Sequence, residues 1–113
     1  HSDRLEIKNQ RTGQVLHHCF SFYESFQREA SSLNIQRSIE LLKGPIFIAH
    51  AKDDESVLPS EAMVLGHASG SQVNWIESGG HTFGACHPWT QLVLPVPLKE
   101  LVSRTRLFLD GLK

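Results

Sequence analysis

Two polar loops of the chain hold side chains of the kind that move protons. One loop, residues 51–57, follows a short apolar run and carries adjacent acidic side chains. The other loop, residues 78–83, follows a second short run and carries His81 directly after two glycines. A carboxylate beside an imidazole forms an acid–base relay, because the carboxylate orients the ring and stabilises its protonated form while the ring removes a proton from a nucleophile. The residue types therefore predict acid–base chemistry if the fold brings the loops together.

The loops follow two predicted strands. Residues 45–50 form a short apolar run that ends in the polar His50, is too short for a helix and is typical of a fully buried strand in a parallel sheet. Residues 72–77 form the second strand, and a helix from Pro59 to about Leu65 lies between the two. A short strand–helix–strand unit implies parallel pairing. Ligands in open α/β sheets bind beyond the carboxyl ends of the strands, so we expect both loops at one edge.

The clearest predicted helix lies near the end of the chain. Apolar residues repeat at helical spacing from Leu98 to Leu112, Pro97 suits the first turn, and Gly111 suits the end. The expected order from residue 34 onward is helix, strand, helix, strand, helix. Two strands make a thin sheet, so we expect the C-terminal part of a larger α/β domain, or a sheet that another chain completes.

The N-terminal part differs in character. Residues 4–19 predict a hairpin with a polar turn, and Ser21 with Glu24 predicts a capping box at the start of a helix. This helix is expected to end near residues 31–32. Asn34 is then the candidate N-cap of a second short helix.

Composition excludes several classes of function. The chain has 113 residues with 11 basic and 12 acidic side chains, so its formal net charge is −1. This balance argues against a nucleic-acid partner and against a basic membrane-binding patch. No apolar run approaches the roughly 20 residues that cross a bilayer, so we expect no membrane partner.

The cysteines and histidines do not form a recognised site. Cys19 and Cys86 lie far apart, and two reduced thiols are favoured over one disulfide, which favours the cytoplasm over secretion while leaving the location open. His17 and His18 next to Cys19, and His87 next to Cys86, lack a recognised zinc spacing. We therefore expect no metal and no cofactor.

The two loops resemble those of the α/β-hydrolase superfamily. Residues 50–57, His-Ala-Lys-Asp-Asp-Glu-Ser-Val, resemble the H-G-x-x-D-x-x-V-P segment, with Ala51 in place of the usual glycine and one extra residue before Pro59. The segment is most similar to dienelactone-hydrolase-like and prolyl-oligopeptidase-like members. Residues 78–84, with residues 87–89 and the final helix, look like the catalytic-histidine loop and C-terminal helix of these enzymes.

The resemblance covers residues 34–113 and implies an α/β fold. It implies the C-terminal part of an α/β-hydrolase sheet, with parallel strands and flanking helices, preceded by a hairpin and a short helix. Residues 1–33 would then form a lid, a cap or a connecting region. By position, Asp54 matches the catalytic acid and His81 matches the general base, in the family's chain order of acid before histidine.

The nucleophile of such an enzyme is missing from the 113 residues. No G-x-S-x-G motif occurs, and residues 66–70, which come nearest, place the serine one position late and between acid and base. We interpret residues 66–70 as the exit of a helix. Cys86 lies too close to His81 in the chain to be a nucleophile on a separate element. The oxyanion-hole loop is missing as well.

Two hypotheses follow. The first is a serine hydrolase that acts on a small-molecule carboxylic ester or thioester through Asp54, His81 and a serine outside this sequence. Its partner would be the missing N-terminal half of the fold or a second chain, with a homodimer as one form. The alternative is a non-catalytic α/β binding module or fragment without a nucleophile. In that case the acidic run is a solvated loop and His81 is a turn residue. In either case, His50 is expected to make a structural hydrogen bond.

Overall fold

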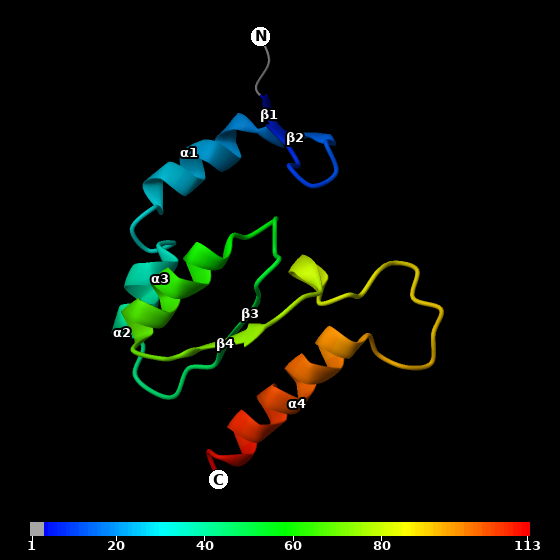
Figure 1. The fold of residues 1–113 in the computed structure, drawn as a ribbon. Helices are drawn as coiled ribbons and strands as arrows, with labels where there is room; N and C mark the ends of the chain where they lie inside the picture. Colours follow the sequence, from blue (N-terminus) through cyan, green and yellow to red (C-terminus); the bar gives the residue numbers. More distant parts are fainter. Residues whose placement is uncertain (1–3) are drawn as a thin grey trace. The chain divides into compact units, whose positions relative to one another are not determined.

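The computed structural model describes residues 4–113 as a mixed α/β protein (Figure 1). The described residues form four α-helices, a two-stranded antiparallel sheet and a two-stranded parallel sheet. The chain divides into two compact units, the first ending at Leu42 and the second beginning at Lys43. No helix within residues 4–113 combines the length and the apolar character needed to cross a membrane.

The first unit begins with the predicted hairpin. Strands β1 (Arg4–Lys8) and β2 (Val15–Cys19) pair antiparallel. The Asn9 side chain accepts hydrogen bonds from two backbone N–H groups of the turn at 3.0 and 3.2 Å, and Gly13 has a φ of 72°. An asparagine that bonds its own turn and a glycine with positive φ explain why the chain reverses here. The predicted hairpin is confirmed.

Helix α1 (Phe20–Arg28) follows β2 without a loop. Cys19 is both the last strand residue and the N-cap, and no side-chain hydrogen bond caps the helix. Ser21 therefore lies inside the first turn, where its side chain cannot take the N-cap position. The capping box of Ser21 and Glu24 was a wrong prediction for this reason. The helix also ends before the expected serines, with Glu29 as its C-cap.

Helix α2 (Ile35–Leu41) also belongs to the first unit. The predicted cap is confirmed, because the Asn34 side chain accepts a hydrogen bond from the Arg37 N–H at 2.9 Å. The helix is short because Leu42 is already extended, and Gly44 follows with a φ of 133°.

The second unit contains the predicted parallel pair. Strands β3 (Ile48–Ala51) and β4 (Val73–Ile76) pair in parallel, and helix α3 (Pro59–Ser69) connects them with its proline in the first turn. The full burial expected of the first strand is wrong. Only the last residue of each, Ala51 and Ile76, is buried. The reason is that the described residues add no third strand to this sheet.

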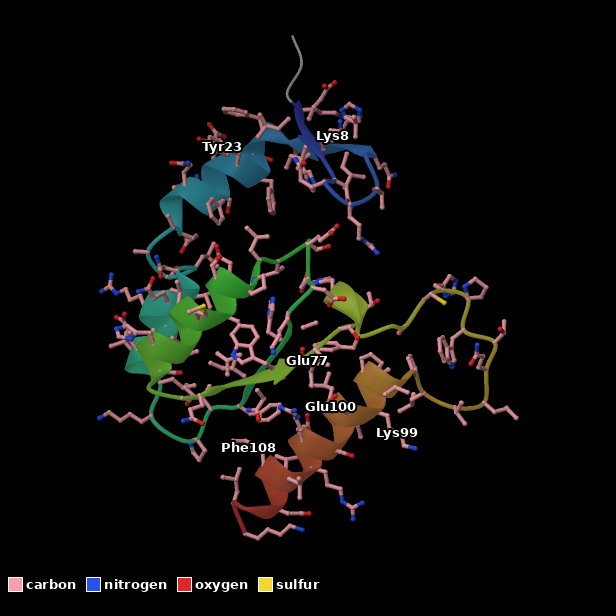
Figure 2. The ribbon with its side chains drawn as sticks, in the orientation of Figure 1. Lys8, Tyr23, Glu77, Lys99, Glu100 and Phe108 are labelled. Carbon is pink, nitrogen blue, oxygen red and sulfur yellow. The ribbon has the colours of Figure 1, made fainter. Side chains whose placement is uncertain are left out.

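Helix α4 (Val96–Asp110) packs beside β4 (Figure 1). The ring of Phe108 lies 5.3 Å from the ring of Phe47, which precedes β3. Figure 2 shows Phe108 on the side of α4 that faces the strands and Lys99 on the side that points away. The predicted helix is confirmed, with Gly111 at its C-terminal cap, but Val102 and Leu109 of its predicted apolar repeat are exposed.

The hydrophobic core of the described residues is small. Its fully buried apolar residues are Ala51, Ala62 and Ile76, although 40% of the chain is hydrophobic. Large apolar side chains are exposed in both units, including Val96, Val102, Leu107 and Leu109 on α4. Isolated exposed apolar residues are common, but several on one helix leave much apolar surface in water.

Candidate active site

The two polar loops meet at the carboxyl ends of β3 and β4. The strand register pairs Ala51 with Ile76, and the ladder continues one step further with a 2.8 Å hydrogen bond from the Lys52 N–H to the Ile76 carbonyl. The Lys52 ammonium also pairs with the Glu77 carboxylate across the two strand ends. Figure 2 shows Glu77 where β4 ends, directly before the loop that carries His81. The expected edge of the sheet therefore holds both loops.

The structure brings Asp54 and His81 into contact. The Asp54 Oδ2 atom lies 3.0 Å from the His81 Nδ1 atom, although the residues are 27 positions apart. An ionised carboxylate only accepts hydrogen bonds, so Nδ1 must be the donor. The lone pair of the neutral ring is then on Nε2, as a general base requires. The His81 side chain is 49% exposed, so solvent reaches the ring.

Asp54 is held as a buried anion. Its side chain is 5% exposed, and its Oδ1 atom accepts hydrogen bonds from the Ser56 and Val57 N–H groups, each at 2.9 Å. Burial alone raises the pKa of the Asp54 carboxyl, but the N–H of Val57, the His81 ring and the N–H of Ser56 outweigh burial and lower the pKa below its ordinary value. The carboxylate is thus charged when the imidazole takes up a proton.

His50 makes the structural hydrogen bond that was predicted for it. Its Nε2 atom lies 2.8 Å from the Val57 carbonyl oxygen, which only accepts, and 3.5 Å from the Asp54 Oδ2 atom. The His50 side chain is 12% exposed, and its ring meets the Trp75 ring edge-on at 6.1 Å. His50 therefore fixes the loop that shapes the Asp54 site.

Asp53 is the site residue that sequence reasoning missed. The resemblance matched only its neighbour Asp54 to the catalytic acid and gave Asp53 no role. Its Oδ1 atom accepts a hydrogen bond from the Gly80 N–H at 2.8 Å, and its Oδ2 atom accepts one from the Gly79 N–H at 3.1 Å. The hydrogen bonds from these two N–H groups lower the pKa of the Asp53 carboxyl, and the one from Gly80 has the larger effect. The sequence signal was a carboxylate after one strand and paired glycines after the next. The third acidic residue, Glu55, is exposed.

The loop of His81 is built on glycine conformations. Gly79 and Gly80 have φ values of 120° and 62°, which residues with a side chain rarely adopt. A short 3₁₀ helix (Gly80–Thr82) begins at the second glycine. A Cβ atom on Gly79 would lie 2.7 Å from the Cβ of Pro97 in α4, so the loop also packs against that helix. His81 is thus carried on a tightly specified turn.

The other candidate residues take no part in the Asp54–His81 hydrogen bond. Residues 66–70 form the last turn and C-cap of α3, which runs to Ser69 and so extends four residues past the predicted end near Leu65, and Gly70 ends it with a φ of 70°. Cys19 and Cys86 are free and exposed. Within residues 4–113, no group of three or more histidine, cysteine or acidic side chains is placed to hold a metal ion.

The arrangement supplies a proton-accepting imidazole with a buried carboxylate behind it. Compared with protein-family models and with curated proteins, the chain matches none. The observation that bears on function is the geometry of the Asp54–His81 pair and of the residues that hold it.

Proposed function

We propose that this chain is the C-terminal part of a serine hydrolase of the α/β-hydrolase type. The single observation that carries the proposal is the 3.0 Å contact between the buried Asp54 carboxylate and His81 at the carboxyl edge of two parallel strands. The chain order of acid before histidine and the motif resemblance of residues 50–57 support it.

The proposed reaction is acyl transfer through a serine outside this sequence. The His81 Nε2 atom accepts the serine proton as the serine oxygen attacks the carbonyl carbon of a carboxylic ester or thioester. The imidazolium then gives this proton to the departing alcohol or thiol. In the second half of the reaction, His81 takes a proton from water as the water oxygen attacks the acyl-enzyme, and the proton returns to the serine when the acid leaves. No cofactor takes part.

The role of Asp54 in this reaction is electrostatic. The carboxylate stays ionised because its N–H donors and His81 lower its pKa despite burial. It therefore faces the imidazolium with a full negative charge in a partly buried site, where the attraction is stronger than in water. Its hydrogen bond also holds the ring so that Nε2 is the atom left for the nucleophile.

A non-catalytic α/β binding module is the second proposal. The observation that favours it is the exposure of large apolar side chains on one face of α4, including Val102 and Leu109, which are seven positions apart. Such a face is stabilised when another polypeptide covers it, either a second copy of the chain or the rest of a larger fold. In this proposal the Asp54–His81 pair only stabilises the loops.

One experiment separates the two proposals. The complete reading frame that encodes residues 1–113 is expressed, and a fluorophosphonate probe tests for an activated serine while p-nitrophenyl acetate measures turnover. The hydrolase proposal predicts a probe adduct on a serine outside these residues, and His81→Ala should lower turnover about 10²- to 10⁴-fold. His67→Ala is the matched control, because His67 is exposed in the last turn of α3.

The opposite result would favour the binding module. If the complete protein forms no adduct, and if His81→Ala and His67→Ala turn over the ester equally, the hydrolase proposal is wrong. Sedimentation of the same preparation then shows whether the chain associates with itself.

A further inference from the structure

The adjacent carboxylates of Asp53 and Asp54 serve opposite sides of the site. Asp54 points inward, is buried and bonds the His81 ring, whereas Asp53 is exposed and bonds the backbone that carries His81. The two Asp53 oxygens are divided between the two N–H groups of Gly79 and Gly80. Both contacts run from the loop after β3 to the loop after β4.

The backbone at Gly79 and Gly80 needs such an acceptor. The 3₁₀ helix begins at Gly80, and the first N–H groups of a helix have no partner within it. Hydrogen bonds inside the loop satisfy other groups, since the Gly84 N–H donates to the Gly79 carbonyl at 2.7 Å and the Phe83 N–H donates to the Gly80 carbonyl at 3.2 Å. The Asp53 carboxylate accepts hydrogen bonds from the N–H groups of the two glycines.

We infer that Asp53 is a positioning residue, which fixes the His81 loop so that the imidazole meets Asp54 with its Nε2 atom free. The catalytic meaning of this inference rests on the proposed hydrolase function. The two hydrogen bonds from Gly79 and Gly80 to Asp53, which we call the clamp, are a property of the chain itself. Asp53 acts through the backbone, so His81 remains the group that would meet the reacting atoms. The charge strengthens the clamp, because a hydrogen bond from an N–H to a carboxylate is stronger than one to a neutral oxygen.

The geometry explains why a shift of this loop matters. His81 follows Gly80 directly, so a movement of the glycine backbone moves the imidazole against a fixed, buried Asp54. A displacement of about 1 Å at a reacting group lowers a rate by about a hundredfold. We therefore expect loss of Asp53 to lower kcat about ten- to a hundredfold with little change in KM.

The test compares Asp53→Asn with Glu55→Gln in the full 113-residue chain. The two substitutions remove the same charge from neighbouring exposed carboxylates, but Glu55 makes neither glycine contact. Nuclear magnetic resonance follows hydrogen exchange at Gly79 and Gly80 and the signal of the His81 Nδ1 proton. For Asp53→Asn we expect exchange at both glycines to rise about tenfold and the Nδ1 proton signal to broaden or disappear. Glu55→Gln should change neither.

Turnover of p-nitrophenyl acetate by the complete protein supplies the catalytic readout. Unchanged glycine exchange in Asp53→Asn would overturn the clamp. Faster exchange with an unchanged Nδ1 signal and unchanged kcat would also overturn the inference, because Asp53 would then be structural only. If Asp53→Asn does not fold, Asp53→Glu is measured instead. Its longer side chain should also raise hydrogen exchange at Gly79 and Gly80 and broaden the Nδ1 proton signal.

Failure of the hydrolase proposal is recognised separately. In that case the complete protein shows no His81-dependent turnover at all. The exchange rates and the Nδ1 signal then still decide whether Asp53 holds the His81 loop.

Discussion

The Asp54 Oδ2 atom lies 3.0 Å from the His81 Nδ1 atom, and the two residues follow neighbouring parallel strands. The carboxylate is 5% exposed while the imidazole is 49% exposed. The pair therefore joins a protected anion to a ring that solvent reaches. This difference in exposure fits the roles proposed for Asp54 as the acid and for His81 as the general base.

Loss of the Asp54 carboxylate should destabilise the second unit. In Asp54→Ala the N–H groups of Ser56 and Val57 lose their acceptor, and each hydrogen bond to a charged group contributes about 1.5–3 kcal/mol. We expect the free energy of unfolding of the chain to fall by about 2–4 kcal/mol. Urea unfolding measures this change, with Glu55→Ala as the exposed control. Equal midpoints for the two variants would contradict the prediction.

The same carboxylate should make stability fall in acid. The native pKa of Asp54 lies below its ordinary value of 3.8, so between the two values the unfolded chain binds more protons than the native chain. Its contribution is thus fully present above the ordinary value and is lost as pH falls through the lowered native pKa. Urea midpoints of the chain measured from neutral pH downward should show this loss. Asp54→Asn should remove this part of the dependence of the urea midpoint on pH. If the variant depends on pH as strongly as the wild-type chain, the prediction is wrong.

Gly79→Ala should damage the His81 loop more than Gly80→Ala. Both glycines have positive φ, so a side chain at either position strains the backbone by about 1–2 kcal/mol. A Cβ on Gly79 would in addition lie 2.7 Å from the Cβ of Pro97, whereas a Cβ on Gly80 would meet nothing within 4 Å. Thermal unfolding and the His81 Nδ1 proton signal compare the two variants. A larger effect of Gly80→Ala would mean that packing against α4 does not determine the conformation of the His81 loop.

His50→Ala should lower the stability of the chain but have little effect on turnover by the folded protein. The His50 ring contacts the Val57 carbonyl at 2.8 Å and packs against Trp75, and its removal ends both contacts. Truncation of a buried hydrogen-bonded ring should lower the free energy of unfolding by about 1–3 kcal/mol. Urea unfolding measures this loss. Turnover by the folded fraction of the complete protein should fall far less than in His81→Ala, and an equal fall would place His50 in the reaction.

Most elements of the chain follow from local signals. The hairpin turn, the Asn34 cap, the proline at the start of α3 and the periodic apolar face of α4 each depend on neighbouring residues in the chain. The capping box at Ser21 was wrong although its pattern was present. In the structure β2 runs directly into α1, so the helix begins at Phe20, two residues before the start that Ser21 as N-cap predicts. Pairing between strands thus overrode a local pattern.

The sequence by itself determined the order of the elements and the pairing of a carboxylate loop with a histidine loop. Local propensity and a parallel connection suffice for that, because the carboxyl ends of parallel neighbours lie at one edge of the sheet. Only the tertiary structure decided that Asp54 is buried, that Asp53 bonds Gly79 and Gly80, and that the strands stay partly exposed. A backbone N–H group is the same in every residue except proline, so its partner has no signature in the sequence. Burial depends on which elements cover a residue, and that is a property of the assembled fold.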